Sequence, residues 1–338
     1  MSAKLGHVSR INSGPYEETV ALSSAFADQL AVWGPNVQSR RAPTHAEAEA
    51  YCRRLAKSHY ENFPVVTWLL PRPMHQPFCN IYAFCRWADD LGDEVGDPEK
   101  SRSLLKWWRD ELAACYEGDA QHPVFVALRP TIGEFGIPQQ PFSDLISAFE
   151  QDQTIRDYET FEELLDYCRR SANPVGRLVL YLCRQANDEN FRWSDSICTG
   201  LQLANFWQDV ARDFDIGRVY LPQEDRRRFG YSADDLRGRM ANGPFLELME
   251  FEVARTRRWL RPWRDETLCE LAPFPVRLRA VIELFARGGE RILDRIEAIG
   301  YRVWDTRPVV TKRDVAWMIL GCLGQIVKRQ ILRLTRHA

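Results

Sequence analysis

Two acidic stripes with the same spacing stand out in this sequence, and the first lies in residues 82–94. This segment, YAFCRWADDLGDE, carries Asp89 and Asp93, and Asp97 follows four residues later. Residues at i, i+4 and i+8 line one face of a helix, and like charges at that spacing destabilise an isolated helix. Mg2+ is typically held by carboxylate oxygens together with substrate phosphates. We therefore predict a helix whose acidic face binds Mg2+, with Asp90 as a supporting group.

The second stripe repeats this spacing more than a hundred residues later. Asn205, Asp209 and Asp213 again lie at i, i+4 and i+8, and Gln202 precedes Asn205 by about one turn. A single pair of this kind is usually part of a solvated helix face, but both stripes are embedded in aromatic and apolar residues. Two such helices facing each other across a cavity would hold a cluster of Mg2+ ions and a diphosphate. Because both stripes must meet at one site, we expect one domain, although 338 residues would often form two.

The remaining sequence predicts helices only. Residues 1–44 mix Gly, Pro, Ser and charges without periodicity, so we expect an irregular arm followed by an all-α domain over 45–338. Thr44 and Glu47 form a capping-box pattern near the start of that domain. No alternation typical of strands is found. The expected helices are 100–117, 121–135, 141–157, 160–171, 191–214, a charged pair in 224–239, 244–265, 276–299 and 311–333.

Proline interrupts the helical pattern at Asn173-Pro174. A proline inside a helix removes a hydrogen bond and kinks the helix. Two interpretations stay open at this point: a simple helix boundary, or a kink whose freed carbonyl groups face a cavity.

Composition excludes several classes of protein. A net charge of -2 shows no signature of nucleic-acid binding. Nine scattered cysteines without C-x-x-C pairs predict reduced thiols, which fits the cytoplasm, and the N-terminus shows no apolar run typical of a signal peptide. The apolar run 315–327 is too short to span a bilayer. We interpret it as a docked helix, and the basic turns that follow as a peripheral contact with the inner face of the cell membrane; a cationic helix end complementing the helix dipole is the alternative.

Both acidic stretches resemble the two aspartate-rich motifs of the squalene and phytoene synthase family, and the resemblance covers about residues 46–327. The segments HYENFP at 59–64 and YCRRSANPVGR at 167–177 are similar to one branch, the bacterial hydroxysqualene synthases of hopanoid biosynthesis. This resemblance implies a single-domain isoprenoid-synthase helical bundle around a central cavity. It implies presqualene diphosphate as the substrate, whose cation is captured by water, without a nicotinamide cofactor.

The chemistry assigns roles to individual residues. Mg2+ ions act as Lewis acids on a diphosphate leaving group, and arginine forks match phosphate oxygens. Aromatic rings attract the carbocation that remains. The resemblance further implies that His59, Phe63, Tyr82 and Tyr167 lie near the substrate, and Gln202 near the second motif. The predicted metal ligands are Asp89, Asp93, Asp209 and Asp213, supported by Asp90 and Asn205; the predicted diphosphate ligands are Arg86 and Arg218; the predicted rings are Phe63, Tyr82, Tyr167 and Phe206.

Three other functions remain open on sequence alone. A squalene, dehydrosqualene or phytoene synthase would join two prenyl diphosphates such as farnesyl diphosphate. A non-catalytic assembly factor on the same fold could lose its metal ligands, whereas both motifs are intact here. For the enzyme, we expect contact with other squalene-pathway enzymes as partners. A di-iron helical bundle would need Glu-x-x-His pairs, and none is present. Related synthases show Ala-Gly-x-Val-Gly where this chain has Ala172 to Gly176, which favours the hydroxysqualene branch.

Overall fold

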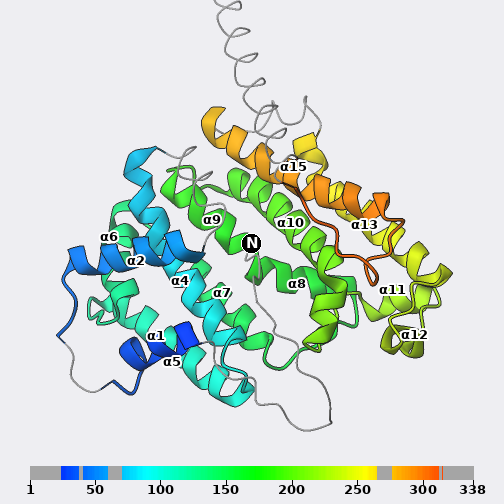
Figure 1. The fold of residues 1–338 in the computed structure, drawn as a ribbon. Helices are drawn as coiled ribbons and strands as arrows, with labels where there is room; N and C mark the ends of the chain where they lie inside the picture. Colours follow the sequence, from blue (N-terminus) through cyan, green and yellow to red (C-terminus); the bar gives the residue numbers. More distant parts are fainter. Residues whose placement is uncertain (1–23, 38–40, 60–70, 265–275, 312–313, 315–338) are drawn as a thin grey trace, which may run out of the picture. The chain divides into compact units, whose positions relative to one another are not determined.

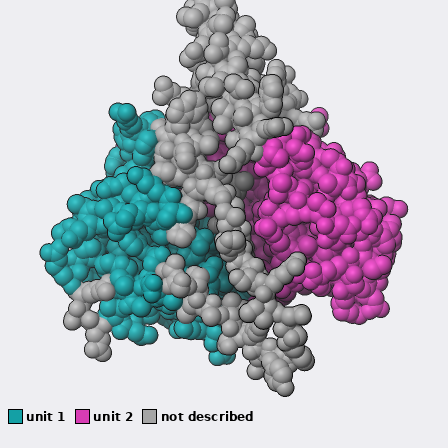
Figure 2. All heavy atoms as spheres, viewed as in Figure 1, with its two compact units in different colours: residues 1–154 teal, residues 155–338 magenta. Residues whose placement is uncertain are grey.

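A computed structural model describes residues 24–37, 41–59, 71–264, 276–311 and 314 of the chain (Figure 1). These residues form helices joined by connections, and the β-type pairing recorded among them is one isolated bridge between Asp157 and Val219. The expected all-α fold class is therefore confirmed. Internal contacts divide the chain into two compact units, Met1–Thr154 and Ile155–Ala338 (Figure 2).

Unit 1 is built around the helix that carries the first stripe. That helix, α4, contacts α2, α5, α6 and α7. Asn80 on α4 fastens it to α6, because its Nδ2 donates to the Ala127 carbonyl at 2.9 Å and to Thr131 Oγ1 at 3.0 Å. The helices of this unit are α1 (Ser24–Trp33), α2 (His45–His59), the 3-10 turn η1 (Arg72–Met74), α4 (His75–Asp93), α5 (Pro98–Glu117), α6 (Pro123–Phe135) and α7 (Gln140–Gln151).

The core of unit 1 is aromatic. Trp87 on α4 stacks on Trp108 of α5 with ring centroids 5.3 Å apart, and Phe84 packs against Phe142 of α7 at 4.8 Å. These four side chains are fully buried. Because Trp87 and Phe84 point inward, the other face of α4 is left to carry its polar residues.

Unit 2 is built around the helix that carries the second stripe. That helix, α10, packs against α8, α9, α13 and α15. Trp207 of α10 is buried, and its Nε1 donates to Thr256 Oγ1 of α13 at 2.7 Å. The helices of this unit are α8 (Phe161–Ser171), α9 (Asn173–Leu182), α10 (Asp188–Asp215), α11 (Gln223–Arg228), α12 (Ala233–Arg237), α13 (Gly243–Arg264) and α15 (Val276–Ala298).

Most of the expected helices are found at their expected places, and a helix is also present where we expected none. Residues 24–33 are helical, whereas we expected an irregular arm. Burial explains the difference, since Phe26 is enclosed against Trp87 with their rings 5.4 Å apart. The expected helix 141–157 ends at Gln151. The expected helix 311–333 and the basic turns after it lie almost wholly outside the described residues.

The break at Asn173-Pro174 is a helix boundary rather than a kink within one helix. Helix α8 ends at Ser171, and α9 begins at Asn173 with Pro174 in its first turn. Proline is tolerated there because the first N–H groups of a helix have no partner within the helix. The first of the two interpretations is therefore confirmed.

Candidate active site

The first acidic stripe lies on the last turns of α4. Asp89, Asp90 and Asp93 all belong to this helix, which ends at Asp93. Arg86 lies one turn earlier. Its Nε donates to Asp90 Oδ2 at 3.0 Å, and its Nη1 contacts Asp89 Oδ2 at 3.5 Å. The stripe therefore has a cation within hydrogen-bonding reach on the same helix.

Asp90 is the buried member of this group. Its residue exposure is 4%, and its other carboxylate oxygen is ion-paired with Arg86 Nη2. Burial raises the pKa of Asp90 to about 7, against the opposing effect of the Arg86 charge. The contacts support a role for Asp90 in holding Arg86 in place, and metal binding by Asp90 stays a prediction.

Asp97 does not continue this stripe, which corrects our expectation of three acids on one helix face. The chain leaves α4 after Asp93 and turns at Gly96, whose φ is 72°. Asp97 is the N-cap of α5, and its Oδ1 accepts hydrogen bonds from the N–H groups of Glu99 at 2.9 Å and Lys100 at 3.2 Å. A capping carboxylate satisfies the free N–H groups at a helix start, so Asp97 belongs to α5.

The second stripe lies on α10, and this helix is bent at the middle of the stripe. Asn205, Asp209 and Asp213 all belong to α10, as does Gln202 one turn earlier. Asp209 has φ of -107° and ψ of 15°, outside the helical range. Backbone of this bridge type is sparsely populated and recurs at active-site residues. The bend therefore singles out Asp209 among the predicted ligands.

Asp209 is held by an arginine from the far end of the described chain. Arg307 donates from Nε to Asp209 Oδ1 at 2.5 Å and from Nη2 to Oδ2 at 3.1 Å. The adjacent Gln208 Nε2 donates to the Pro308 carbonyl at 2.7 Å, which fastens the same segment to α10. The carboxylate that we predicted as a metal ligand is therefore engaged by a guanidinium in this structure.

A pocket in unit 2 combines polar and aromatic residues around the end of the second stripe. Asp213 and Arg218 lie on its wall together with Phe206 and Tyr220. The backbone N–H of Arg218 donates to the Asp213 carbonyl at 2.8 Å, which places the loop residue beside the stripe. Asp215, the next acid along the chain, pairs with Arg239 at 2.6 Å. Arg218 and Asp213 are thus brought to one pocket.

Four aromatic rings are clustered beside this pocket. Phe206 lies face to face with Tyr220, with centroids 3.9 Å apart and planes within 14°. Tyr167 of α8 is 6.2 Å from Phe206, and Tyr158 is 5.8 Å from Tyr220. All four side chains are buried. Two of the predicted rings, Tyr167 and Phe206, therefore belong to one aromatic wall.

Backbone hydrogen bonds join the segment before α8, residues 156–158, to the segment after α10, residues 219–223. The N–H of Val219 donates to the Arg156 carbonyl at 2.7 Å, and the N–H of Gln223 donates to the Tyr158 carbonyl at 2.9 Å. These bonds place Tyr158 next to Tyr220.

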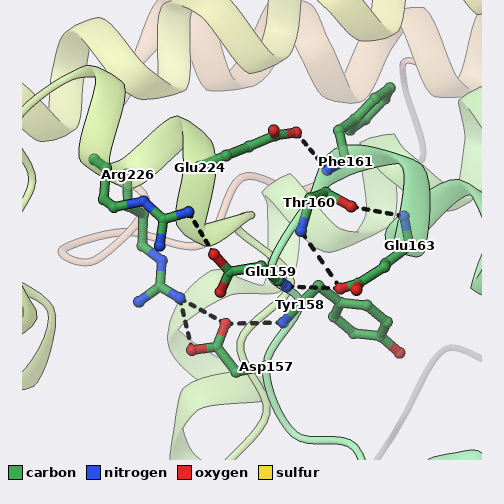
Figure 3. Close-up of polar contacts among 9 residues, drawn as sticks. Asp157, Tyr158, Glu159, Thr160, Phe161, Glu163, Glu224 and Arg226 are labelled. Carbon is green, nitrogen blue, oxygen red and sulfur yellow. Dashed lines mark hydrogen bonds and ion pairs between the residues drawn. The ribbon is translucent and has the colours of Figure 1, made fainter.

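Ion pairs reinforce the same junction (Figure 3). The Nη2 group of Arg226 donates to both oxygens of Asp157 at 2.6 Å. Glu224 accepts from the N–H of Phe161 at 2.7 Å, at the start of α8. Arg226 is buried, whereas the neighbouring pair of Arg227 with Glu159 is exposed. The pair of the buried Arg226 with the half-exposed Asp157 is therefore the contact best placed to hold the aromatic wall.

The other predicted residues are described in part. Tyr82 is half-buried on α4, four residues before Arg86 and hence on the same helix face. Gln202 and Asn205 are also half-buried. His59 is the last residue of α2, but its side chain and the whole of Phe63 lie outside the described residues. The first stripe belongs to unit 1 and the second to unit 2, and their meeting at one cavity stays a prediction.

The donor chemistry of both stripes fits Mg2+. Within the described ranges no group of three or more His, Cys, Asp or Glu side chains is arranged to hold a metal ion. Mg2+ does not require such a cage, since it is commonly bound through one or two carboxylates plus substrate phosphates and water. Asp89 with Asp93, and Asp209 with Asp213, offer carboxylates in that number on single helices.

Sequence reasoning did not identify Arg307, Tyr158 or Tyr220. Arg307 belongs to no recognisable motif and lies 98 residues from its partner. Tyr220 follows the predicted diphosphate ligand Arg218 by two residues, so its position could have indicated a role. Tyr158 is not near any predicted ligand in the sequence, so the sequence gives no indication of its role.

Several known proteins are similar to this chain in sequence and in fold. The family model described as squalene/phytoene synthase matches residues 56–314. A hydroxysqualene synthase from Rhodopseudomonas palustris is 32% identical over 255 residues, covering 74% of this chain and 85% of the relative. A phytoene synthase from Arthrospira platensis is 30% identical over 300 residues, covering 84% of this chain and 94% of the relative.

A solved structure agrees with these relatives. The crystal structure of squalene synthase HpnC from Alicyclobacillus acidocaldarius superimposes with a TM-score of 0.71 at 42% sequence identity, covering 76% of this chain and 95% of that one. The helical architecture of isoprenoid synthases is therefore shared by this protein. Since the family model spans well over half of the sequence, the chain belongs to the squalene/phytoene synthase family, whose members are isoprenoid synthases acting on prenyl diphosphates.

Proposed function

We propose that this protein is a hydroxysqualene synthase that converts presqualene diphosphate to hydroxysqualene and diphosphate. The observation that carries the proposal is the pocket of unit 2, in which Asp213 and Arg218 adjoin the stacked rings of Phe206 and Tyr220. An ionisation reaction needs a polar end for the diphosphate and an electron-rich wall for the cation. This pocket offers both kinds of residue side by side.

Asp89, Asp93, Asp209 and Asp213 would hold Mg2+, with Asn205 and Asp90 in support. A bound Mg2+ cluster would act as a Lewis acid that neutralises the charge of the departing diphosphate. Arg86 and Arg218 add guanidinium groups that match phosphate oxygens. When the C–O bond breaks, its electron pair goes to the diphosphate, and a carbocation remains on the hydrocarbon.

The aromatic wall stabilises this cation. The faces of Tyr and Phe rings attract cations, more strongly in a desolvated site. Phe206 and Tyr167 supply rings from α10 and α8, and Tyr220 and Tyr158 extend the wall. Since all four side chains are buried, the wall also limits the access of bulk water. The final water must therefore be admitted and placed by the protein.

Product analysis tests the proposal. The protein would be incubated with Mg2+ and either presqualene diphosphate or farnesyl diphosphate, with and without a nicotinamide cofactor, followed by mass analysis. We expect an alcohol from presqualene diphosphate without the cofactor, with labelled oxygen when the water is labelled. Squalene formed only with the cofactor would contradict the proposal.

A phytoene or dehydrosqualene synthase is the second candidate, and a specific comparison favours it. The Arthrospira phytoene synthase aligns with a larger share of the chain than the Rhodopseudomonas hydroxysqualene synthase does. Such an enzyme would join two prenyl diphosphates and end by proton loss. The same incubations distinguish it, because it would consume a prenyl diphosphate such as farnesyl diphosphate and release a hydrocarbon instead of an alcohol.

We further propose cytoplasmic action with peripheral contact to the membrane surface. None of the helices in the described ranges combines the length and the apolar composition needed to cross a bilayer. The proposed substrate carries a long hydrocarbon chain, and residues 328–338 include Lys328, Arg329, Arg333 and Arg336. Sedimentation with anionic and neutral vesicles, comparing the full chain with one truncated after residue 327, tests this contact. Equal binding of the full and the truncated chain would show that the basic residues after position 327 do not contribute to membrane contact.

A further inference from the structure

A buried polar pair joins the start of α9 to α10. Thr199 Oγ1 donates a hydrogen bond to Asn173 Oδ1 at 3.0 Å. The two residues are 4% and 7% exposed, and most of their neighbours on these helices are apolar. Asn173 is the first residue of α9 and is followed by Pro174, so it stands at the helix boundary described above.

Close packing of the two helices holds this pair in place. A Cβ atom added at Gly176 would lie 2.2 Å from Ser194 Oγ and 2.6 Å from Cys198 Sγ of α10. Real Cβ atoms do not approach other atoms so closely, so only glycine permits this contact without displacement. Gly176 lies one turn after Asn173, and Cys198 directly precedes Thr199. The approach at Gly176 therefore sets Asn173 against Thr199.

The amide of Asn173 keeps unused hydrogen-bonding capacity. Within the described part of the chain, the Asn173 side chain makes one hydrogen bond, in which its Oδ1 accepts from Thr199. The Nδ2 group therefore has two N–H donors to offer. In proteins, polar groups of this kind are commonly hydrogen-bonded to an ordered water.

The pair lies on the helix face that leads to the aromatic wall. Thr199, Gln202 and Phe206 are spaced by three and four residues on α10, so they share one face. Seven residues of helix rise by about 10 Å, which separates Thr199 from Phe206 along this face. Tyr167, from the helix before Asn173, contacts Phe206 at 6.2 Å. Asn173 and Tyr167 are thus two successive contacts of the same chain segment with one face of α10.

We infer that the amide of Asn173, oriented by Thr199, binds the water molecule that ends the reaction as an alcohol. This inference rests on the proposed function. An N–H of Asn173 donates to the water oxygen, and the remaining lone pair of that oxygen forms the C–O bond to the carbocation. The proton lost from the resulting oxonium passes to the diphosphate already released. Asn173 is then a catalytic residue, and Thr199 is a positioning residue.

The product ratio of two variants tests this assignment with presqualene diphosphate and Mg2+. Asn173→Ala removes the donor, so the cation loses a proton instead and yields a hydrocarbon. We expect the ratio of alcohol to hydrocarbon to fall at least about tenfold, which corresponds to about 1.4 kcal/mol. Thr199→Val keeps the shape of Thr199 but frees the amide to rotate, and we expect a smaller fall. The ratio does not depend on the amount of active enzyme.

The control is Thr256→Val, which removes another buried threonine hydroxyl, the one that accepts a hydrogen bond from Trp207 of α10. It should lower the melting temperature without changing the ratio. An unchanged ratio in folded Asn173→Ala overturns the inference. If Asn173→Ala does not fold, Thr199→Val is the deciding variant. A ratio of alcohol to hydrocarbon equal to that of Thr256→Val would then overturn the inference. Absence of alcohol from the unmodified protein would instead refute the proposed function itself.

Discussion

The guanidinium of Arg307 is bound to both carboxylate oxygens of Asp209, with Nε to Oδ1 at 2.5 Å and Nη2 to Oδ2 at 3.1 Å. Asp209 is also the residue at which α10 bends. A bidentate arginine–carboxylate pair is among the stronger polar contacts in proteins. Any cation that binds Asp209 must therefore compete with Arg307 or share the carboxylate with it.

Removal of Arg307 should uncover this competition. We expect Arg307→Ala to bind Mg2+ more tightly in the absence of substrate, because Asp209 no longer has to leave its partner. Without metal, the free energy of unfolding should fall by about 1–3 kcal/mol, since a partly buried carboxylate loses its charged hydrogen bonds. Titration calorimetry and urea denaturation measure the two effects.

Arg212 offers a matched control for Arg307. Its Nε lies 3.9 Å from Asp209 Oδ1, and its side chain is half exposed. Arg212→Ala should leave Mg2+ binding and stability almost unchanged, because exposed pairs contribute little. Weaker Mg2+ binding by Arg307→Ala would show that Arg307 assists the metal site instead of competing with it.

Substitution of the predicted metal ligands should abolish Mg2+-dependent turnover. Asp89→Ala and Asp209→Ala each remove a carboxylate, and we expect the rate to fall by about 100-fold or more while the fold persists. Asp215→Ala is the control, since this acid follows the second stripe but pairs with Arg239. Circular dichroism checks the fold, and release of diphosphate measures turnover. Near-normal turnover in either of the first two variants would contradict the metal assignment.

The ion pair of Arg226 with Asp157 should contribute more to stability and to substrate binding than the exposed pair of Arg227 with Glu159. Arg226→Met leaves the half-exposed Asp157 without its guanidinium partner, and we expect the free energy of unfolding to fall by about 1 kcal/mol, since solvent screens Asp157 in part. KM should rise as Tyr158 and Tyr220 lose their fixed placement. Arg227→Met, which breaks the exposed pair with Glu159, should leave stability almost unchanged, because exposed ion pairs contribute little. Equal effects of the two substitutions on KM would exclude a positioning role for Arg226.

Unit 1 should lose stability in acid because of one buried histidine. His122 caps α6 by accepting the N–H of Val124 at Nδ1, at 3.2 Å, and it lies among tryptophan rings, with Trp87 4.6 Å and Trp108 4.9 Å away. Burial lowers the pKa of His122 from its ordinary value of 6.5 to about 3. The unfolded chain therefore takes up a proton at a higher pH than the folded chain does.

The sign of this effect follows from linkage. Stability from neutral His122 is fully present above pH 6.5 and is lost as the pH falls from 6.5 toward 3. At pH 4.5 the loss should be about 3 kcal/mol, at 1.36 kcal/mol for each pH unit. His122→Asn keeps a capping group but cannot titrate, so its melting temperature should fall less between pH 7 and pH 4.5. His45→Asn, at a half-exposed position beside Glu49, should retain the full acid sensitivity.

Local features of this protein were predictable from sequence because they depend on neighbours along the chain. The capping box was expected at Thr44, and Thr44 N–H does donate to Glu47 Oε2 at 2.7 Å. The placement of both acidic stripes on helices was likewise expected from the spacing of their residues, and α4 and α10 confirm it. Spacing also misled in one place, since Asp97 continues the i, i+4 pattern but caps the next helix.

Contacts between distant segments were decided by the tertiary structure alone. Nothing in the sequence pairs Arg307 with Asp209, because the two residues belong to different elements and meet only when the 304–311 segment packs on α10. The same holds for Tyr158 and Tyr220, which lie side by side because backbone hydrogen bonds join residues 156–158 to 219–223. Periodicity determines which face of a helix a residue occupies, whereas the partner on that face depends on how the helices pack.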